Sequence, residues 1–119
     1  MMRTFFRYLA VGGLMLTLVA IAAAADFEGI LIDKSCSASA VKGGEKAALA
    51  HTRDCALMPN CVKSGYGIYM NNKFIPFDAA GNKRALAALK ASKKPDNLRV
   101  QVTGEQTGNL IKVQSLKLL

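Results

Sequence analysis

Alternation of apolar and polar side chains dominates the chain beyond its N-terminal quarter. Apolar side chains occupy every second position in residues 65–70 and 98–102, as expected for strands with one buried face. Residues 27–33 are rich in β-branched and aromatic side chains and predict the first strand. Residues 111–118 also alternate, but their phase changes near Gln114, which indicates a β-bulge.

A hairpin is predicted in the middle of the chain. Residues 73–77 form a second short strand directly after residues 65–70. Asn71 and Asn72 lie between the two strands, and asparagine tolerates the positive φ angles of a type I′ turn. Pro76 lacks an amide donor, so we expect its strand at the edge of a sheet.

Two stretches have helical character. Residues 45–58 contain several good helix formers and end at Pro59, and Thr52 is a candidate N-cap for a second short helix within them. A clearer helix, capped by Asp78 or Asn82, extends through residue 92, with leucines three positions apart on one face.

The predicted order is strand, helical insert, strand, strand, helix, strand, strand. This order predicts a mainly β fold with one or two helices, a five-stranded OB-fold-like barrel, in which closure removes the exposed sheet edges. An open α+β sheet is the alternative. The insert, residues 37–64, lies between the first two strands and starts with small polar residues interrupted by Gly43 and Gly44.

A basic and then apolar leader precedes this domain. Two arginines come first, residues 8–25 are almost wholly apolar, and Ala23 and Ala25 fit the small-residue rule for cleavage. We therefore expect a secretory signal peptide over residues 1–25 and one exported domain, periplasmic or extracellular, over residues 26–119. No membrane span is then left after cleavage, and a transmembrane anchor is the alternative.

The charge of the chain bears on its partners. The chain carries 16 Lys and Arg against 8 Asp and Glu, a net charge of +8, which falls to +6 when the two leader arginines are removed. The expected partner is an unknown protein, an anionic surface or a small ligand, and the positive charge favours the anionic surface. Export disfavours nucleic acid, and lysines that only keep a small domain soluble are the simplest explanation.

Four side chains carry most of the potential chemistry. Cys36, His51, Cys55 and Cys61 are all the cysteines and the only histidine of the chain. Disulfides form outside the cytoplasm, so Cys36 is expected to pair with Cys55 or Cys61, and Cys55 with Cys61 is a further pairing. An odd number of cysteines leaves one thiol over in every case.

A metal site is the alternative use of the same four residues. Cys36, His51, Cys55 and Cys61 form a candidate Cys₃His set, which suits tetrahedral Zn²⁺ or Cu(I) and accounts for the odd cysteine. His51 and Cys55 are four residues apart, which puts them on one face of a helix, and Asp33 is a candidate to orient His51. A third hypothesis is thiol–disulfide exchange, with His51 lowering the pKa of Cys55, although no Cys-x-x-Cys motif is present.

Three aromatic side chains in the predicted hairpin are a weaker candidate site. Tyr66, Tyr69 and Phe74 offer a ligand-binding face on an OB-like barrel. Aromatic residues in strands are also common in the core and in cross-strand pairs.

The pattern as a whole resembles a family of small exported bacterial proteins of unknown function. The resemblance rests on a strand that ends in Asp-x-x-Cys at Asp33 and Cys36, on the His/Cys/Cys stretch of residues 51–61, and on Val-x-Val-x-Gly at residues 100–104. It covers nearly all of the chain after the leader. It implies export and a common role for the three cysteines and the histidine, and it implies no reaction.

These observations favour a binding or accessory module over an enzyme. No oxyanion hole that would serve a catalytic Cys–His pair is marked in the sequence. We expect a small exported domain that is stabilised by a disulfide of Cys36 or that carries a Cys/His metal site. Zinc or Cu(I) binding through Cys36, His51, Cys55 and Cys61 is the alternative function, and thiol redox activity is the third.

Overall fold

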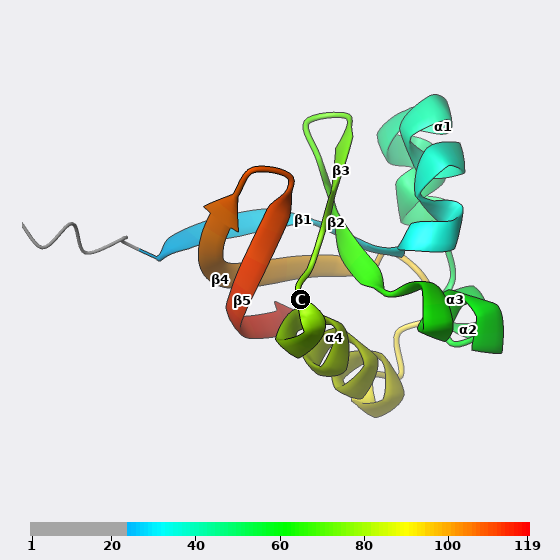
Figure 1. The fold of residues 1–119 in the computed structure, drawn as a ribbon. Coiled ribbons are helices and arrows are strands. Elements are labelled where there is room, and N and C mark those ends of the chain that lie inside the picture. Colours follow the sequence, from blue (N-terminus) through cyan, green and yellow to red (C-terminus); the bar gives the residue numbers. More distant parts are fainter. Residues whose placement is uncertain (1–23) are drawn as a thin grey trace, which may run out of the picture.

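The structure is a computed structural model that describes residues 24–119. Most of the predicted signal peptide, residues 1–23, lies outside these described residues. Figure 1 shows the fold, whose five-stranded antiparallel sheet has the order β3-β2-β1-β4-β5. The strands are β1 Ala25–Asp33, β2 Tyr66–Met70, β3 Lys73–Pro76, β4 Arg99–Thr107 and β5 Leu110–Leu118.

Helices cover both faces of the sheet. A turn of 3-10 helix, η1 Lys34–Cys36, follows β1, and then come α1 Ser37–Ala50, α2 Arg53–Ala56 and α3 Pro59–Ser64, with α4 Ala79–Ala91 between β3 and β4. Within the described residues, none of the helices combines the length and the apolar character needed to cross a membrane.

Strand β1 is the middle strand of the sheet, and its apolar side chains are buried on both faces. Leu31 faces the main core, where it packs with residues of α4, β4 and β5, such as Leu89. Ile30 and Ile32 point to the opposite face and pack with Ala48 of α1 in a second, smaller cluster. Each fully buried aliphatic side chain of this kind contributes about 1.5–3 kcal/mol to stability.

The helical share of the chain exceeds the prediction. Helices take 42% of the described residues and strands 39%, so the domain is mixed α/β. The prediction of a mainly β fold with one or two helices is confirmed for the five-stranded sheet and underestimates the number of helices. The difference lies in the insert, residues 37–64, which is helical over most of its length. Its alanines favour a helix even though the amphipathic pattern is weak.

The sheet is not plainly closed into a barrel. Phe77, directly after the edge strand β3, forms an isolated parallel bridge with Ile111 of the other edge strand, β5. The five strands and the helix between the third and fourth of them are confirmed.

Local signals in the sequence are confirmed where they depend on near neighbours. Asn71 and Asn72 have φ angles of 52° and 58°, as the type I′ turn requires. Pro76 lies in the edge strand β3. Ser115 pairs with Thr103 but Val113 pairs with Gly104, so Gln114 between them is the extra residue of the expected bulge. Asp78 caps α4.

Candidate metal centre

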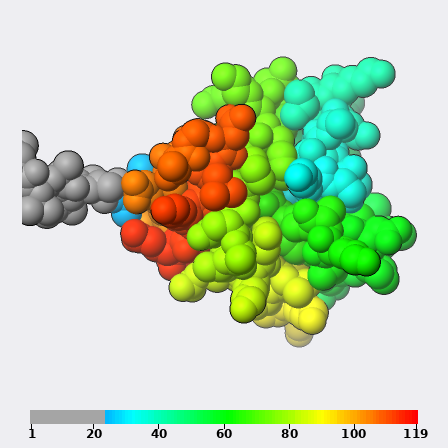
Figure 2. All heavy atoms as spheres, in the orientation of Figure 1, coloured from blue at the N-terminus to red at the C-terminus, as the bar shows by residue number. Residues whose placement is uncertain are grey.

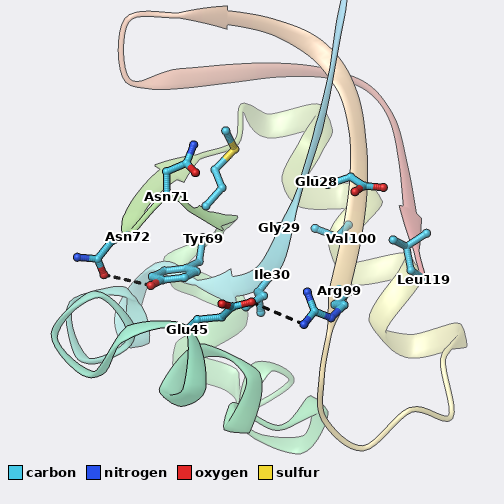
Figure 3. Close-up of a pocket in the computed structure, with 11 residues that line it drawn as sticks. Glu28, Gly29, Ile30, Glu45, Tyr69, Asn71, Asn72, Arg99, Val100 and Leu119 are labelled. Carbon is cyan, nitrogen blue, oxygen red and sulfur yellow. Dashed lines mark hydrogen bonds and ion pairs between the residues drawn. The ribbon is translucent and has the colours of Figure 1, made fainter.

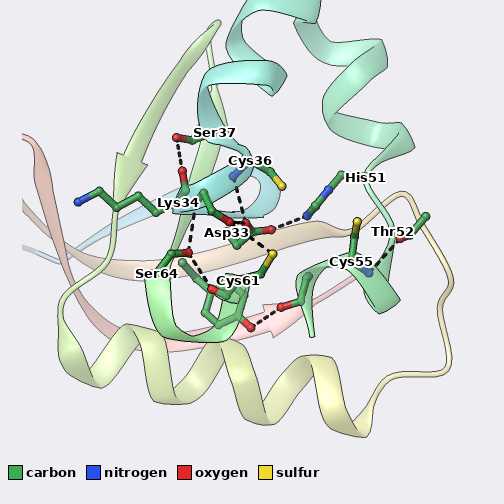
Figure 4. Close-up of polar contacts among 12 residues, drawn as sticks. Asp33, Lys34, Cys36, Ser37, His51, Thr52, Cys55, Cys61 and Ser64 are labelled. Atoms are coloured by element: carbon green, nitrogen blue, oxygen red, sulfur yellow. Dashed lines mark hydrogen bonds and ion pairs between the residues drawn. The ribbon is translucent and has the colours of Figure 1, made fainter. Parts of the chain in front are cut away.

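The centre of the site is Asp33, the last residue of β1. It is 0% exposed, and among the described residues it is the only charged side chain that is buried. Its Oδ1 atom accepts a hydrogen bond from His51 Nε2 at 2.6 Å, and its Oδ2 atom accepts one from the Cys36 amide at 3.1 Å and one from the Ser35 hydroxyl (Figure 4). Both oxygens are therefore satisfied, without which burial of the carboxylate would be very costly.

The local sequence explains how Cys36 comes close to this carboxylate. Asp33 has an extended backbone and is the N-cap of η1, so its side chain bonds to an amide three residues later. That amide belongs to Cys36, which in turn precedes α1. The Asp-x-x-Cys spacing is therefore the spacing of a helix cap, and it fixes the start of the insert to the end of β1.

Gly44 brings the two ends of α1 together. A straight helix of 14 residues would be about 21 Å long. The Cys36 sulfur before α1 and a ring nitrogen of His51 after it nevertheless lie within 4.8 Å of each other. The chain reverses at Gly44, where φ is 77° and ψ is −169°, so that α1 consists of two short helical segments side by side (Figure 1). This backbone conformation is open almost only to glycine.

The break expected at Gly43 and Gly44 is thus confirmed as a sharp reversal at Gly44. Residues 37–43, for which the sequence predicts only a small polar stretch, form the first helical segment. A glycine pair between two alanine-containing segments therefore marks a helical hairpin in this chain.

The sequence predicts His51 and Cys55 on one face of a helix, but the structure places them in different elements. His51 is the C-cap of α1 with an extended backbone, and α2 begins only at Arg53. Thr52 is the N-cap of α2, where its hydroxyl accepts a hydrogen bond from the Cys55 amide at 3.1 Å, and this part of the prediction is confirmed. The extended residues between the two helices remove Cys55 from the face that carries His51.

The residues that converge are Asp33, Cys36 and His51. One ligand atom of each lies within 4.8 Å of the others, and neither Cys55 nor Cys61 is a member of this group. The sequence predicts Asp33 only as the partner that orients His51, and their hydrogen bond is confirmed. Asp33 is not among the candidate metal ligands that the sequence predicts. The Asp-x-x-Cys spacing is the sequence signal that places Asp33 beside Cys36.

Cys61 borders this group from α3. Pro59 is the first residue of α3 and so starts a helix, where the sequence predicts only the end of one. Cys61 is buried, and its sulfur lies 3.4 Å from the Ser35 Oγ atom, whose proton is donated to Asp33. In Figure 4 the sulfurs of Cys36 and Cys61 lie on either side of the Asp33 carboxylate.

All three cysteines are free thiols in the structure. The pairing of Cys36 with Cys55 or Cys61 is therefore not formed here, and it stays a prediction for the oxidised protein. A disulfide requires Cβ atoms about 3.5–4.5 Å apart, whereas metal ligation leaves the sulfurs separate around one point.

The electrostatics of the group favour a cation. Burial raises the pKa of Asp33, but hydrogen bonds from His51 and Ser35, the charge of His51 and contact with Cys61 outweigh it and hold the pKa well below its usual range. Burial, then the nearby charge of Asp33 and the proximity of Cys61, raise the pKa of Cys36 to about 11. Near neutral pH the site thus combines a carboxylate with a protonated thiol, and a bound cation would favour the thiolate.

The predicted aromatic face is not formed as one surface. Tyr66 is 2% exposed and lies in the main core, where its hydroxyl donates a hydrogen bond at 2.6 Å to the carbonyl of Ala56. Burial raises the pKa of Tyr66 to about 12. Tyr69 and Phe74 pair across β2 and β3 in the second cluster. Residues 66 and 69 lie on opposite sheet faces because strand side chains alternate.

Of the three aromatic residues, Tyr69 lines a cavity. That cavity measures about 420 Å³ and lies beside β1, with Arg99 and Glu45 on its wall (Figure 3). Arg99 and Glu45 form an exposed ion pair at 3.6 Å, and the Tyr69 hydroxyl donates to Asn72. The polar groups of this cavity are therefore largely paired with each other.

Comparison of the chain with models of protein families, with curated proteins and with solved structures gave no match. The resemblance to a family of small exported proteins therefore stays a prediction. A functional conclusion depends on the geometry around Asp33.

Proposed function

We propose that this chain is an exported binding or accessory domain that holds one zinc ion at Asp33, Cys36 and His51. The observation that carries the proposal is the convergence of one oxygen, one sulfur and one nitrogen ligand atom within 4.8 Å. Tetrahedral ligands about 2.0–2.3 Å from a zinc ion lie roughly 3.3–3.8 Å from one another. Small side-chain movements would bring the three atoms to that spacing.

The ligand types support zinc over Cu(I). A set of three cysteines and one histidine suits both ions. A carboxylate oxygen in place of the Cys55 sulfur replaces a soft ligand by a hard one. Cu(I) favours thiolate and thioether ligands, whereas Zn²⁺ accepts sulfur, nitrogen and oxygen together.

Cys61 is the proposed fourth ligand. Its buried sulfur borders the same carboxylate through Ser35, and a fourth protein ligand closes the coordination sphere. Closed sites are structural, and this supports a non-enzymatic role. The ion would tie the end of β1, both ends of α1 and α3 to one point, and would stabilise the insert by its binding energy.

The OB-like fold and the export of the chain belong to the same proposal. The parallel bridge between Phe77 and Ile111 supports an opened OB-like barrel, because it lies where β3 and β5 would close the sheet. The basic and apolar composition of residues 1–25 supports export. The high pKa of Cys36 disfavours this residue as the attacking thiol of an exchange reaction, since the thiolate is the attacking species.

Zinc titration with matched variants tests the proposal. The reduced protein, stripped with a chelator, is titrated with ZnCl₂ in a calorimeter, and we expect one zinc per chain. One proposed ligand is removed in each of the variants Asp33→Asn, Cys36→Ser and His51→Ala. Each variant should bind zinc more than about 100-fold more weakly, because loss of a residue that only supports a ligand costs at most about that factor. Cys55→Ser is the control and should bind like the parent. Equal losses in Cys55→Ser and Cys36→Ser would overturn the proposed ligand set.

Intact mass separates this proposal from a disulfide-stabilised domain. The protein isolated from expressing cells without added reductant is weighed under native and denaturing conditions, and its thiols are counted. We expect a native mass that includes one zinc and three free thiols after denaturation. A zinc-free protein lighter by the two hydrogens of a disulfide, with one thiol left, would contradict the proposal.

A further inference from the structure

An apolar groove lies on the surface between the α2–α3 segment and α4. Its volume is about 580 Å³, and four apolar residues and two lysines line it: Leu57, Pro59, Val62, Lys63, Leu86 and Lys90. Figure 2 shows the green α2–α3 segment and the yellow-green α4 next to each other at the surface. The groove is separate from the candidate metal centre, because Cys61 of α3 is buried while Pro59 and Lys63 of the same helix are exposed.

The helical spacing of the lining residues makes one continuous surface. Pro59, Val62 and Lys63 are three and four positions apart on α3, and Leu86 and Lys90 are four apart on α4. Each helix therefore presents an aliphatic residue followed by a lysine. An exposed apolar surface with a charged rim is typical of an interaction site.

Met58 stands in the sequence between Leu57 and Pro59, which both line the groove. It is 52% exposed and is one of two large hydrophobic residues with high exposure in the described part of the chain. Thioether side chains are flexible and adapt to varied apolar ligands. Met58 therefore adds exposed apolar surface next in the sequence to two lining residues.

The charge of the groove has one sign. Its lining contains Lys63 and Lys90 and no acidic residue. Arg53 adds positive charge beside Lys90, since its Nη2 atom donates to the Lys90 carbonyl at 3.3 Å. The nearest acidic neighbour along the chain, Asp54, is 3.7 Å from Arg53 Nη1 and so is partly neutralised. The groove therefore complements an anion attached to an apolar chain.

We propose that this groove binds a single-chain anionic amphiphile, such as a free long-chain fatty acid. The alkyl chain contacts Leu57, Val62 and Leu86, and the carboxylate lies between Lys63 and Lys90. A volume of about 580 Å³ falls within the range of roughly 300–1,000 Å³ found for small-ligand sites. The aliphatic lining favours an alkyl chain because it offers methyl and methylene contacts and few hydrogen-bond partners. This inference does not rest on the zinc site.

Dodecanoate binding tests the proposal. The ¹⁵N-labelled protein, as isolated from expressing cells, is titrated with dodecanoate below its micelle concentration, and amide shifts are followed by NMR. We expect saturable shifts centred on Val62, Lys63 and Leu86. The double variant Lys63→Glu/Lys90→Glu should bind dodecanoate on the order of tenfold more weakly, because two favourable charge contacts become repulsive.

Matched controls decide between outcomes. Lys83→Glu changes an exposed α4 lysine that does not line the groove and should leave affinity unchanged. The double variant should gain affinity for dodecyltrimethylammonium, a gain that general unfolding would not produce. Shifts confined to another surface, or equal affinity of the parent for both amphiphiles, would overturn the proposal. Binding to phosphatidylglycerol vesicles without binding of monomeric dodecanoate would also overturn it, in favour of a membrane surface.

Discussion

The sheet and the insert, residues 37–64, bury different kinds of side chain. The sheet and α4 share a core of large aliphatic residues such as Leu89 and Ile111. The insert contributes mostly small residues, such as Ala48, to the smaller cluster on the other face, and it contacts the buried carboxylate of Asp33. The sheet is thus stabilised by apolar area spread over many residues, whereas the insert depends on a few polar contacts at one point. Small domains of this kind commonly add a metal or a disulfide.

The largest expected effect is in the shared core. Leu89→Ala removes a fully buried side chain between α4 and the sheet and should lower the free energy of unfolding by about 2–5 kcal/mol. Urea unfolding followed by circular dichroism measures the change. The folded fraction should still bind zinc with the parent stoichiometry. A loss below about 1 kcal/mol would mean that the apolar core does not dominate this half of the molecule.

A smaller and more local effect is expected at the polar contact. His51→Ala leaves the buried Asp33 without its partner on Oδ1 and should cost the metal-free protein about 2–3 kcal/mol. Hydrogen exchange by mass spectrometry should show faster exchange in α1, while β4 and β5 keep their protection. Equal loss of protection in both regions would contradict the view that this contact holds the insert alone.

Gly44 and Gly108 provide a matched pair for the chain reversal. Both have positive φ, 77° and 60°, and an added Cβ at either one meets no atom within 4 Å. Alanine at each position should therefore cost only backbone strain, about 1–2 kcal/mol. Only Gly44→Ala should also weaken zinc binding, by about tenfold, because it opposes the reversal that joins Cys36 to His51. Equal zinc affinity of the two variants would show that the reversal does not build the site.

Acid should act on the insert before the sheet. The pKa of Asp33 is lowered in the folded state, so the unfolded state takes up a proton at higher pH than the folded state. The resulting stability is present above the ordinary carboxylate pKa of about 3.9 and is lost as pH falls through the lowered folded value. We expect the melting temperature of the metal-free protein to fall as the pH is lowered from about 6 to about 3. This fall should be less steep in Asp33→Asn than in the parent. Parallel profiles would contradict this.

The sequence predicts the parts of the fold that depend on near neighbours. The hairpin at Asn71 and Asn72, the bulge at Gln114 and the cap at Asp78 are confirmed, because each follows from backbone preferences within a few residues. The extent of helix in the insert was underestimated, since its alanines carry propensity but little hydrophobic periodicity.

The candidate site was predicted only in part. Cys36 and His51 were named from residue chemistry, and their proximity is confirmed. The removal of Cys55 depends on the extended backbone at His51 and Thr52, and the convergence depends on the reversal at Gly44. Neither follows from side-chain type or spacing, because both are set by how the insert packs on the sheet.

X-ray absorption at the zinc edge tests the proposed centre most directly. We expect mixed ligation in the zinc-loaded protein, with sulfur at about 2.3 Å and nitrogen or oxygen at about 2.0–2.1 Å. The spectrum should be unchanged in Cys55→Ser and should lose sulfur scattering in Cys36→Ser. A shell of oxygen and nitrogen alone, or loss of a sulfur ligand in Cys55→Ser, would contradict a zinc site built from Asp33, Cys36, His51 and Cys61.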